Sequence, residues 1–273
     1  MSVAAVPLND GATIPQLGLG VFQMNDEQAE AAVLVAHEAG YRLIDSAAGY
    51  ENERGVGHAV ARFDRDDIYV TTKLKNDDHG YDEALAAFDL SMSKLGIDTL
   101  DLYLVHWPCP QQNRYVETWR ALVRLREEGR VRSIGVSNFE PHHLRRIVDE
   151  TGVVPAVNQV ELHPFLQQRK LRAVHAELGV VTEAWSPLGQ GRSHLLAHPT
   201  VTGIAAEHAV TPAQVVLAWH LAEGIVVIPK SVTPSRIVEN FGAAELSLGE
   251  AELSAISALD SGARLGPRPD DVD

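Results

Sequence analysis

The feature that most constrains this chain is a series of eight short apolar runs, each ending in a polar or charged residue. Between these runs, apolar residues recur every three or four positions, a spacing typical of amphipathic helices. Strands that alternate strictly with helices form parallel sheets, because each helix returns the chain to the starting edge. Eight such units in 273 residues predict an α/β protein, a closed (β/α)8 TIM barrel in one domain over residues 1–273, rather than an open doubly wound sheet.

The chain is expected to begin with a β-hairpin and to end in an extra helix and an irregular tail. Asn9, Asp10 and Gly11 separate two short extended pieces, and Asp-Gly favours a tight turn because glycine tolerates a positive φ. We expect barrel strands at 17–22, 43–45, 68–73, 102–106, 134–137, 157–161, 181–185 and 225–228. We expect helices at 26–39, 55–63, 85–95, 116–128, from 141, 167–178, 201–208, 212–223, 234–241 and 250–259. The tail at 262–273 is expected to lie over the barrel mouth.

The composition argues against several classes of partner. The formal net charge of −14 disfavours nucleic acid and anionic membranes. No apolar stretch approaches the roughly 20 residues that span a bilayer, and the amino terminus lacks a signal-peptide pattern. Cys109 is the single cysteine, so neither an internal disulfide nor a cysteine metal site is expected. We therefore expect a cytoplasmic protein without a bound metal.

Charged residues at the ends of separate strands indicate an active site. Asp45, Lys73 and His106 each follow an apolar run, and Tyr50 lies five residues beyond the first. A buried strand that ends in Lys or Asp carries a desolvation cost that a partner must offset. The carboxyl ends of barrel strands meet at one face, where barrel enzymes place their active sites. We expect these four side chains to converge there.

Each of these residues also has a structural interpretation. A strand-end aspartate such as Asp45 is usually a helix cap or a turn former, and a loop tyrosine such as Tyr50 is more often a packing residue. His106, next to Trp107, is compatible with a hydrogen-bonded structural histidine. Lys73 is the hardest to explain in this way, because it follows an apolar run where burial is expected. The four together favour catalysis.

Eight segments, in one order along the chain, resemble those of the aldo-keto reductase family, and most closely its prokaryotic branch of 2,5-diketo-D-gluconate reductases. They are GLGVFQM, LIDSAAGYENE, VTTKLKN, LYLVHWP, GVSNF, VNQVELHP, AWSPLGQG and IPKSVTPSRIVENF. The resemblance extends from near residue 18 to residue 241. It implies NADPH-dependent reduction of aldehydes and ketones to alcohols. Tyr50 would be the general acid, assisted by Asp45, Lys73 and His106.

The chemistry of carbonyl reduction supports these roles. Hydride transfer leaves an alkoxide-like oxygen that must receive a proton. A free tyrosine has a pKa of about 10, so it donates a proton readily only if its phenolate is stabilised. The ammonium of Lys73 stabilises that anion, and Asp45 keeps Lys73 charged and in place. His106 can donate a hydrogen bond to the substrate oxygen and orient it.

The sequence lacks a usable Rossmann fingerprint, so the barrel mouth must hold any nucleotide. Gly18-Leu19-Gly20 lacks the third glycine of that motif. Thr233 can cap a helix that begins at Pro234, which leaves backbone N–H groups for an anion. Lys230 and Arg236 add two positive charges beside that helix. The loops after strands seven and eight are also a common phosphate site in barrels.

The resemblance implies a full set of cofactor contacts and favours NADPH over NADH. The implied residues are Ser137, Asn138 and Gln159 at the nicotinamide carboxamide, Trp185 stacked on the ring, Ser186 and Leu188 near the pyrophosphate, Lys230, Ser231 and Arg236 at the 2′-phosphate, and Glu239 and Asn240 at the adenine. Val232 is a further expected cofactor contact.

Three side chains are expected to line the substrate pocket. Two of them, Phe22 and Trp107, are aromatic. Lys75 stands where the family commonly has tryptophan, which predicts a more cationic pocket and an anionic or polyoxygenated substrate. The connections at 108–115 and 189–199 are shorter than in larger relatives, so we expect an open pocket with broad specificity.

Several functions agree with these features to different degrees. The leading one is reduction of a small carbonyl compound: a small dicarbonyl, a sugar-derived ketone or a simple aldehyde. The alternative is an NADPH-binding protein with a redox-sensing or structural role and little turnover. A metal-dependent hydrolase lacks support, because no HExxH motif occurs and His142 and His143 are adjacent on a predicted helix. We expect a monomer.

Overall fold

Eight parallel strands close into a barrel in the computed structural model, which describes residues 3–191 and 193–273. The strands are β3 (Leu19–Gly20), β4 (Leu43–Asp45), β5 (Tyr69–Leu74), β6 (Leu100–Val105), β7 (Val131–Ser137), β8 (Val157–Glu161), β9 (Val181–Trp185) and β10 (Val226–Val227). Their order around the sheet follows their order along the chain. Parallel bridges from Leu17 to Val227 and from Gly20 to Lys230 join the two outer strands. The predicted (β/α)8 barrel is confirmed.

The strands at this closing seam are shorter than the sequence predicts. Residues 17–22 and 225–228 were each expected to be a full strand, but β3 and β10 contain two residues each. Pro229 follows β10 and has no backbone N–H to extend the ladder. At the seam a Cβ on Gly20 would lie 3.0 Å from the carbonyl oxygen of Ile228. Glycine therefore allows the two backbones to approach closely enough to close the barrel.

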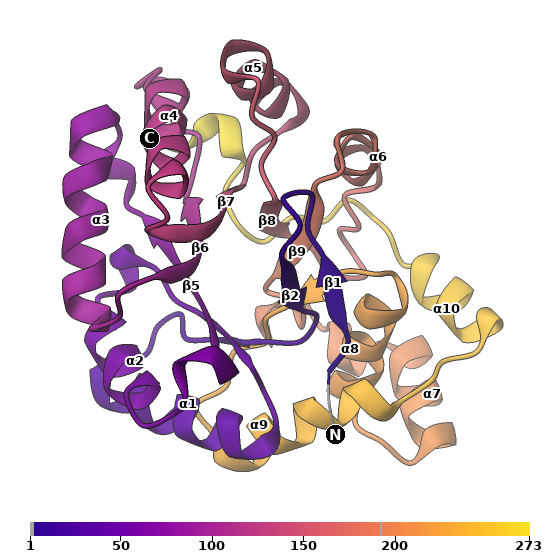
Figure 1. Cartoon of the computed structure of the whole chain (residues 1–273). Coiled ribbons are helices and arrows are strands. Elements are labelled where there is room, and N and C mark those ends of the chain that lie inside the picture. The colour runs from indigo at the N-terminus through magenta and orange to yellow at the C-terminus, as the bar shows by residue number, and fades with distance from the viewer. Residues whose placement is uncertain (1–2, 192) are drawn as a thin grey trace.

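Helices form a ring outside the strands (Figure 1). They are α1 (Asp26–Ala39), α2 (Glu53–Val60), α3 (Tyr81–Leu95), α4 (Tyr115–Glu127), α5 (Pro141–Thr151), α6 (Arg169–Leu178), α7 (Pro199–His208), α8 (Pro212–Ala222), α9 (Pro234–Phe241) and α10 (Glu250–Ser257). Proline in the first turn and a side-chain cap fix several starts; Thr211, for example, accepts a hydrogen bond from the N–H of Gln214. None of these helices, within the part of the chain that the structure describes, is long and apolar enough to cross a membrane.

The barrel interior is apolar at one level and polar at the next. The apolar cluster inside the barrel includes Leu43, Leu102, Leu104, Val157 and Val226. Because side chains alternate along a strand, positions two residues further on point inward as well. Those positions hold Asp45 at the end of β4, His106 just after β6 and Gln159 on β8. Polar side chains therefore gather at the carboxyl-terminal end of the barrel.

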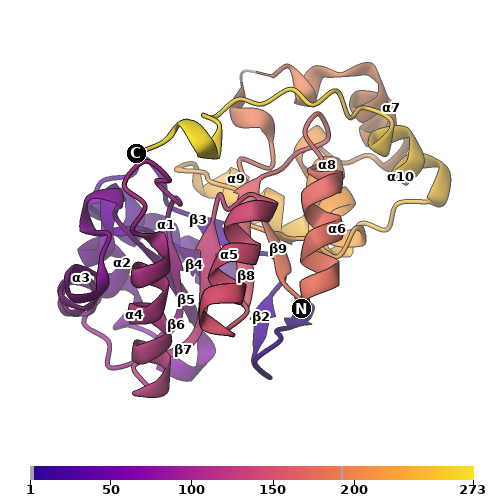
Figure 2. The ribbon, with the colours of Figure 1, turned by 90° about the horizontal axis from the view of Figure 1, so that it is seen from above.

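The two termini cover opposite ends of the barrel (Figure 2). The hairpin of β1 (Ala5–Pro7) and β2 (Thr13–Pro15) forms as predicted, and Gly11 in its turn has a φ of +90°. Leu8 and Ile14 of the hairpin pack against the interior apolar cluster. The tail after α10 lies at the other end, where the backbone N–H groups of Leu265 and Gly266 donate to the Glu161 carboxylate at 2.6 and 2.9 Å.

Candidate active site

A buried ion pair joins the ends of β4 and β5. Lys73 is fully buried, and its Nζ donates to the two carboxylate oxygens of Asp45 at 2.8 and 2.7 Å and to the carbonyl oxygen of Ser46 at 2.8 Å. Gln159 on β8 also donates to Asp45, at 2.7 Å. These contacts satisfy the three ammonium hydrogens and hold both charges in fixed positions.

Tyr50 ends a short 3-10 helix, Ala48–Tyr50, and its hydroxyl oxygen lies 3.5 Å from Nζ of Lys73. The predicted approach of these two groups is therefore present. The pKa of Tyr50 lies above that of a free tyrosine, because burial raises it more than Lys73 lowers it. Lys73 thus lowers the pKa of Tyr50, as predicted, but it offsets only part of the increase that burial causes. Asn52 anchors the segment after Tyr50 by donating to the carbonyl oxygens of Val21 and Met24.

His106 lies against Tyr50 on the side of β6. The two ring centroids are 5.7 Å apart, and the rings meet edge to face. Burial, and then the charge of Lys73, lower the pKa of His106 to about 3. The imidazole is therefore neutral at physiological pH. In that state one ring nitrogen can donate a hydrogen bond to a carbonyl oxygen without adding a second positive charge.

The residues expected at the nicotinamide end form one hydrogen-bonded group. Ser137 Oγ donates to the carbonyl oxygen of Gln159 at 2.8 Å, and Asn138 Nδ2 donates to Ser137 Oγ at 3.0 Å. Trp185 Nε1 donates to Asn138 Oδ1 at 2.8 Å, which orients the indole ring. Asn138 has a φ of +63°, a strained conformation that turns the chain as β7 ends. This group connects to the ion pair through the Gln159 side chain.

The segment expected to hold the phosphate lies at the start of α9. Lys230 and Arg236 are exposed, and neither forms an ion pair with any of the described residues. One detail of the expectation is wrong: Thr233 precedes the helix but its side chain makes no capping hydrogen bond. Instead, the Ser231 hydroxyl accepts a hydrogen bond from the Thr233 N–H at 3.1 Å. That interaction stabilises the turn before Pro234.

The remaining residues expected to contact the cofactor differ in exposure. Ser186 and Leu188 are half-buried and follow β9, and Ser186 has a φ of +51°. Val232 and Glu239 are exposed, whereas Asn240 is buried. Val232 and Glu239, which lie beside and on α9, are therefore accessible to a bound cofactor.

The expected substrate residues surround Tyr50 and Trp185. Phe22 is 52% exposed and its ring centroid lies 4.9 Å from that of Tyr50, while Trp107 and Trp185 are 6.5 Å apart. Lys75 lies just beyond the end of β5, and a Cβ on Gly49 would be 3.8 Å from its Cγ. Lys75 therefore lies beside the loop that carries Tyr50. The short 189–199 connection includes residue 192, which lies outside the described residues.

Two buried carboxyl groups in this region were not identified from the sequence. Glu161 on β8 binds the tail, and a Cβ on Gly266 of that tail would lie 2.6 Å from the Trp185 ring. Glu183 on β9 is also fully buried. Both occur within apolar runs, VNQVELH and VVTEAWS, and a carboxylate inside a buried strand is the signal that marks them.

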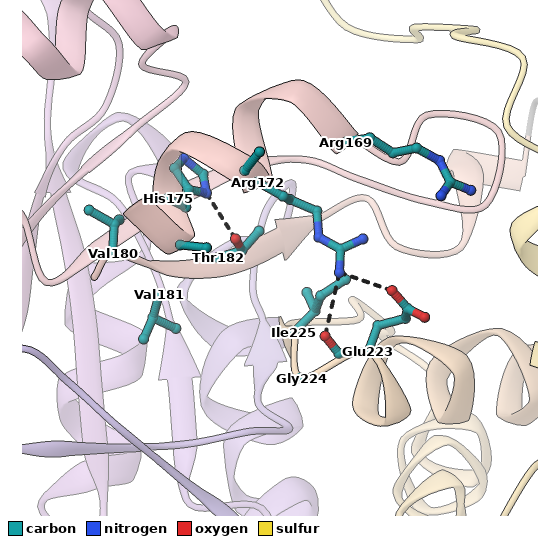
Figure 3. Close-up of a pocket in the computed structure, with 11 residues that line it drawn as sticks. Arg169, Arg172, His175, Val180, Val181, Thr182, Glu223, Gly224 and Ile225 are labelled. Carbon is teal, nitrogen blue, oxygen red and sulfur yellow. Dashed lines mark hydrogen bonds and ion pairs between the residues drawn. The ribbon is translucent and has the colours of Figure 1, made fainter. Parts of the chain in front are cut away.

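A cavity of about 530 Å³ runs along α6 and reaches the beginnings of β9 and β10, away from the carboxyl-terminal end of the barrel. Figure 3 shows two contacts between polar groups of this cavity: Arg172 binds Glu223 at 2.9 Å, and His175 lies 2.8 Å from Thr182. The cavity contains none of the residues expected at the active site.

One trio within the described part of the chain, His142, His143 and Asp270, brings metal-type ligands together. His143 Nδ1 accepts the backbone N–H of Glu140 at 3.1 Å. In the neutral ring this contact places the hydrogen on Nε2, the nitrogen that faces Asp270, so this nitrogen would have to lose its proton before it could bind a metal. His142 Nε2 and His143 Nε2 lie 3.2 and 3.4 Å from one carboxylate oxygen of Asp270, so these contacts join α5 to the tail.

Known proteins resemble this chain over its whole length. The model of the Aldo/keto reductase family matches residues 16–261. An aldo-keto reductase from Mycobacterium sp. (strain KMS) is 56% identical over 271 residues, 98% of each chain. Methylglyoxal reductase DkgA from Escherichia coli (strain K12) is 50% identical over 97% of this chain and 96% of that protein. The crystal structure of a mutant of Gox0644 in complex with NADPH has a TM-score of 0.96 and 47% identity, and the match covers 100% of both chains.

Proposed function

Because this chain belongs to the aldo/keto reductase family and is an NADPH-dependent oxidoreductase, we propose that it reduces small aldehydes and ketones, with Tyr50 as the proton donor. The observation that carries this assignment is the position of Lys73, which binds Asp45 and lies 3.5 Å from the Tyr50 hydroxyl. Lys73 raises the stability of the phenolate that forms when Tyr50 gives up its proton.

The roles of the other two catalytic candidates follow from their charge states. Asp45 holds Lys73 by two hydrogen bonds, so the ammonium stays directed at the barrel mouth. His106 is neutral, because its pKa is lowered to about 3. It donates a hydrogen bond to the carbonyl oxygen and so places that oxygen next to the Tyr50 hydroxyl.

The residues at the barrel mouth fit NADPH, which supplies the hydride when it is bound. Lys230 and Arg236 lack ion-pair partners among the described residues and are free for the 2′-phosphate. Ser137, Asn138 and Gln159 present polar atoms for the carboxamide. Trp185 offers an aromatic surface, fixed by its hydrogen bond to Asn138. The remaining contacts in this proposal come from Ser186, Leu188, Ser231, Val232, Glu239 and Asn240.

The substrate that we propose is a small dicarbonyl, a sugar-derived ketone or a simple aldehyde. The similarity to methylglyoxal reductase DkgA supports the first of these. Phe22 and Trp107 provide apolar walls, and Lys75 beside the Tyr50 loop provides a positive charge. We therefore expect carbonyl compounds that carry a carboxylate or several oxygen atoms to react faster than purely apolar ones.

A spectrophotometric assay of NADPH oxidation with a panel of carbonyls tests this function. The Tyr50→Phe variant removes only the hydroxyl, so it should bind NADPH normally and lose about 100-fold to 10,000-fold in rate, the usual contribution of a positioned acid. Comparable turnover by the variant would exclude Tyr50 as the donor. NADPH binding without turnover of any carbonyl by the unmodified protein would favour the redox-sensing or structural alternative.

We also propose that the protein works as a single-domain monomer in the cytoplasm. Its one cysteine, Cys109, is buried, and burial raises the pKa of the thiol to about 12, so it has little thiolate character. A structure without disulfides suits a reducing compartment. Sedimentation analysis of the full chain, at concentrations used for the assay, tests the monomer.

A further inference from the structure

Glu183 is a buried carboxyl group in the barrel that the proposed proton transfer does not use. It lies in the middle of β9, where it pairs in register with Gln159 on β8 and Val226 on β10. Val181 and Trp185, two positions away on either side, pack against the apolar cluster inside the barrel. Because side chains alternate along a strand, the carboxyl group of Glu183 also points into the interior.

The surroundings of this carboxyl group stabilise a negative charge only weakly. Neither of its oxygens has a hydrogen bond with good geometry to any of the described residues. A buried carboxylate without a partner is costly, so such a group keeps its proton. Burial, and then the charge of Asp45, raise the pKa of Glu183 to about 8, even though Gln159 and Lys73 act in the opposite direction. At neutral pH the group is therefore mostly neutral.

The charge state of Glu183 affects the groups proposed to donate the proton. The titratable groups on neighbouring elements whose charges interact with that of Glu183 are Asp45 on β4, Tyr69 and Lys73 on β5, and Tyr50 before α2. From β10 it meets the apolar Val226. A negative charge on Glu183 raises the pKa of Tyr50 and that of Lys73. An ionised Glu183 would place two carboxylates around one ammonium, and the Tyr50 phenolate would become harder to form.

We propose that Glu183 is a positioning residue for carbonyl reduction, which stays protonated beneath the Asp45–Lys73 pair so that Lys73 has one carboxylate partner and can assist Tyr50. This inference rests on the proposed function, because it assigns Glu183 a role in the proton donation by Tyr50. It predicts that reduction slows when Glu183 loses its proton, even while Tyr50 keeps its own.

The Glu183→Gln variant tests this role, since glutamine preserves the shape and the neutral charge but cannot ionise. The rate of a single turnover, the oxidation of bound NADPH by methylglyoxal, is measured from about pH 6 to about pH 10. The wild-type rate should fall several-fold around the pKa of about 8. In the variant this fall should be absent, and only the loss at higher pH due to Tyr50 should remain. Overlapping profiles would overturn the proposal.

Glu161→Gln is the matched control, because Glu161 is equally buried on the adjacent strand. Burial raises its pKa, but hydrogen bonds from His163 and from the tail N–H groups of Leu265 and Gly266 outweigh burial and hold the pKa below the ordinary value. It is therefore ionised at neutral pH already. Its substitution should leave the fall near pH 8 in place; loss of the fall in this control too would count against a specific role of Glu183.

Two further measurements do not depend on turnover. At neutral pH, wild type should show the infrared absorption of a protonated carboxyl group that Glu183→Gln lacks, also in the Tyr50→Phe background. Since the folded pKa is raised from 4.5 to about 8, the stability contributed by the neutral form is present below the unfolded pKa and lost as pH rises through 8. The melting temperature of wild type should therefore fall relative to that of Glu183→Gln as the pH rises from 4.5 to about 8.

These results separate the two hypotheses. A missing infrared band refutes the role of Glu183 while carbonyl reduction by Tyr50 can still hold. Absence of any carbonyl reduction refutes the proposed function and, with it, a role of Glu183 in that reaction. If Glu183→Gln does not fold, Glu183→Asp replaces it, because aspartate retains an ionisable carboxyl group. This variant should keep the pH-dependent fall in rate. A profile of Glu183→Asp without that fall would also refute the proposal.

Discussion

The ammonium group of Lys73 is buried among oxygen atoms from two neighbouring residues, Asp45 and Ser46. Burial alone would lower its pKa, but Asp45 and Tyr50 more than offset this effect, so the pKa is raised. Each charge of the pair is stable in the interior only while the other is present. The residue that assists Tyr50 in our proposal is therefore also a structural residue, and these two contributions can be measured separately.

Replacing Lys73 by methionine should destabilise the protein by about 3–5 kcal/mol, because the Asp45 carboxylate is left buried without its ion-pair partner. The Asp45→Asn/Lys73→Met double variant removes both charges and should recover most of that loss, yet it should not recover carbonyl reduction. Denaturant unfolding gives the free energies, and the NADPH assay gives the rates. A double variant as unstable as Lys73→Met would show that the pair does not determine stability in this way.

At the scale of elements, the placement of Tyr50 depends on how α2 packs against α1. The Asp26 side chain at the start of α1 accepts the N–H of Gly55 in α2 at 2.8 Å. A Cβ on Gly55 would lie 2.1 Å from the carbonyl oxygen of Asp26, far inside contact distance. Glycine thus allows α2 to begin close to α1, and the segment with Tyr50 leads directly into α2.

Gly55→Ala should therefore destabilise the protein by about 1–3 kcal/mol through overpacking and should lower the rate of reduction by displacing Tyr50. Gly203→Ala in α7 is the matched control: its Cβ would meet nothing within 4 Å, and alanine there should stabilise the helix by about 0.5–1 kcal/mol. Thermal melts of both variants measure these changes in stability. If Gly55→Ala melts at or above the wild-type temperature, the close packing of α1 and α2 is not required.

For the whole molecule, buried neutral histidines predict how stability changes in acid. Burial is the main cause that lowers the pKa of His79, His143, His175 and His220 from 6.5 to about 4. Unfolded histidines take up protons near pH 6.5, whereas these side chains in the folded state do so only near pH 4. The unfolded state therefore binds more protons between these values, and folded stability is lost as pH falls through this window.

The free energy of unfolding should decrease by up to about 1.4 kcal/mol per pH unit for each such histidine. Denaturant titrations from pH 7 down to about pH 4 measure the slope. His220→Gln should lower the stability at pH 7 but reduce the slope, because one buried group no longer titrates. His58→Gln serves as the surface control. A wild-type slope near zero would contradict the buried, neutral state of these histidines.

How far the sequence predicts the fold depends on which interactions determine each feature. Helix α9 begins at Pro234 and ends at Phe241, as predicted, because proline and the local apolar spacing determine it. Strands β3 and β10 are shorter than predicted, because their ladder depends on Gly20 and Ile228, more than 200 residues apart, meeting at the seam. The missing cap at Thr233 has a similar origin: whether a hydroxyl reaches a backbone N–H depends on the turn geometry, which the residue type does not specify.

By itself, the sequence determined the alternation of strands and helices and the positions of Asp45, Lys73 and His106 at successive strand ends, because periodicity and strand termination are local properties. Only the tertiary structure decided that the Tyr50 hydroxyl lies 3.5 Å from Lys73, that Glu183 has no hydrogen-bond partner among the described residues, and that the tail contacts Glu161. The physical reason is that distances between remote residues, and the loss of water around a charge, are determined only when the barrel closes and its registers are set.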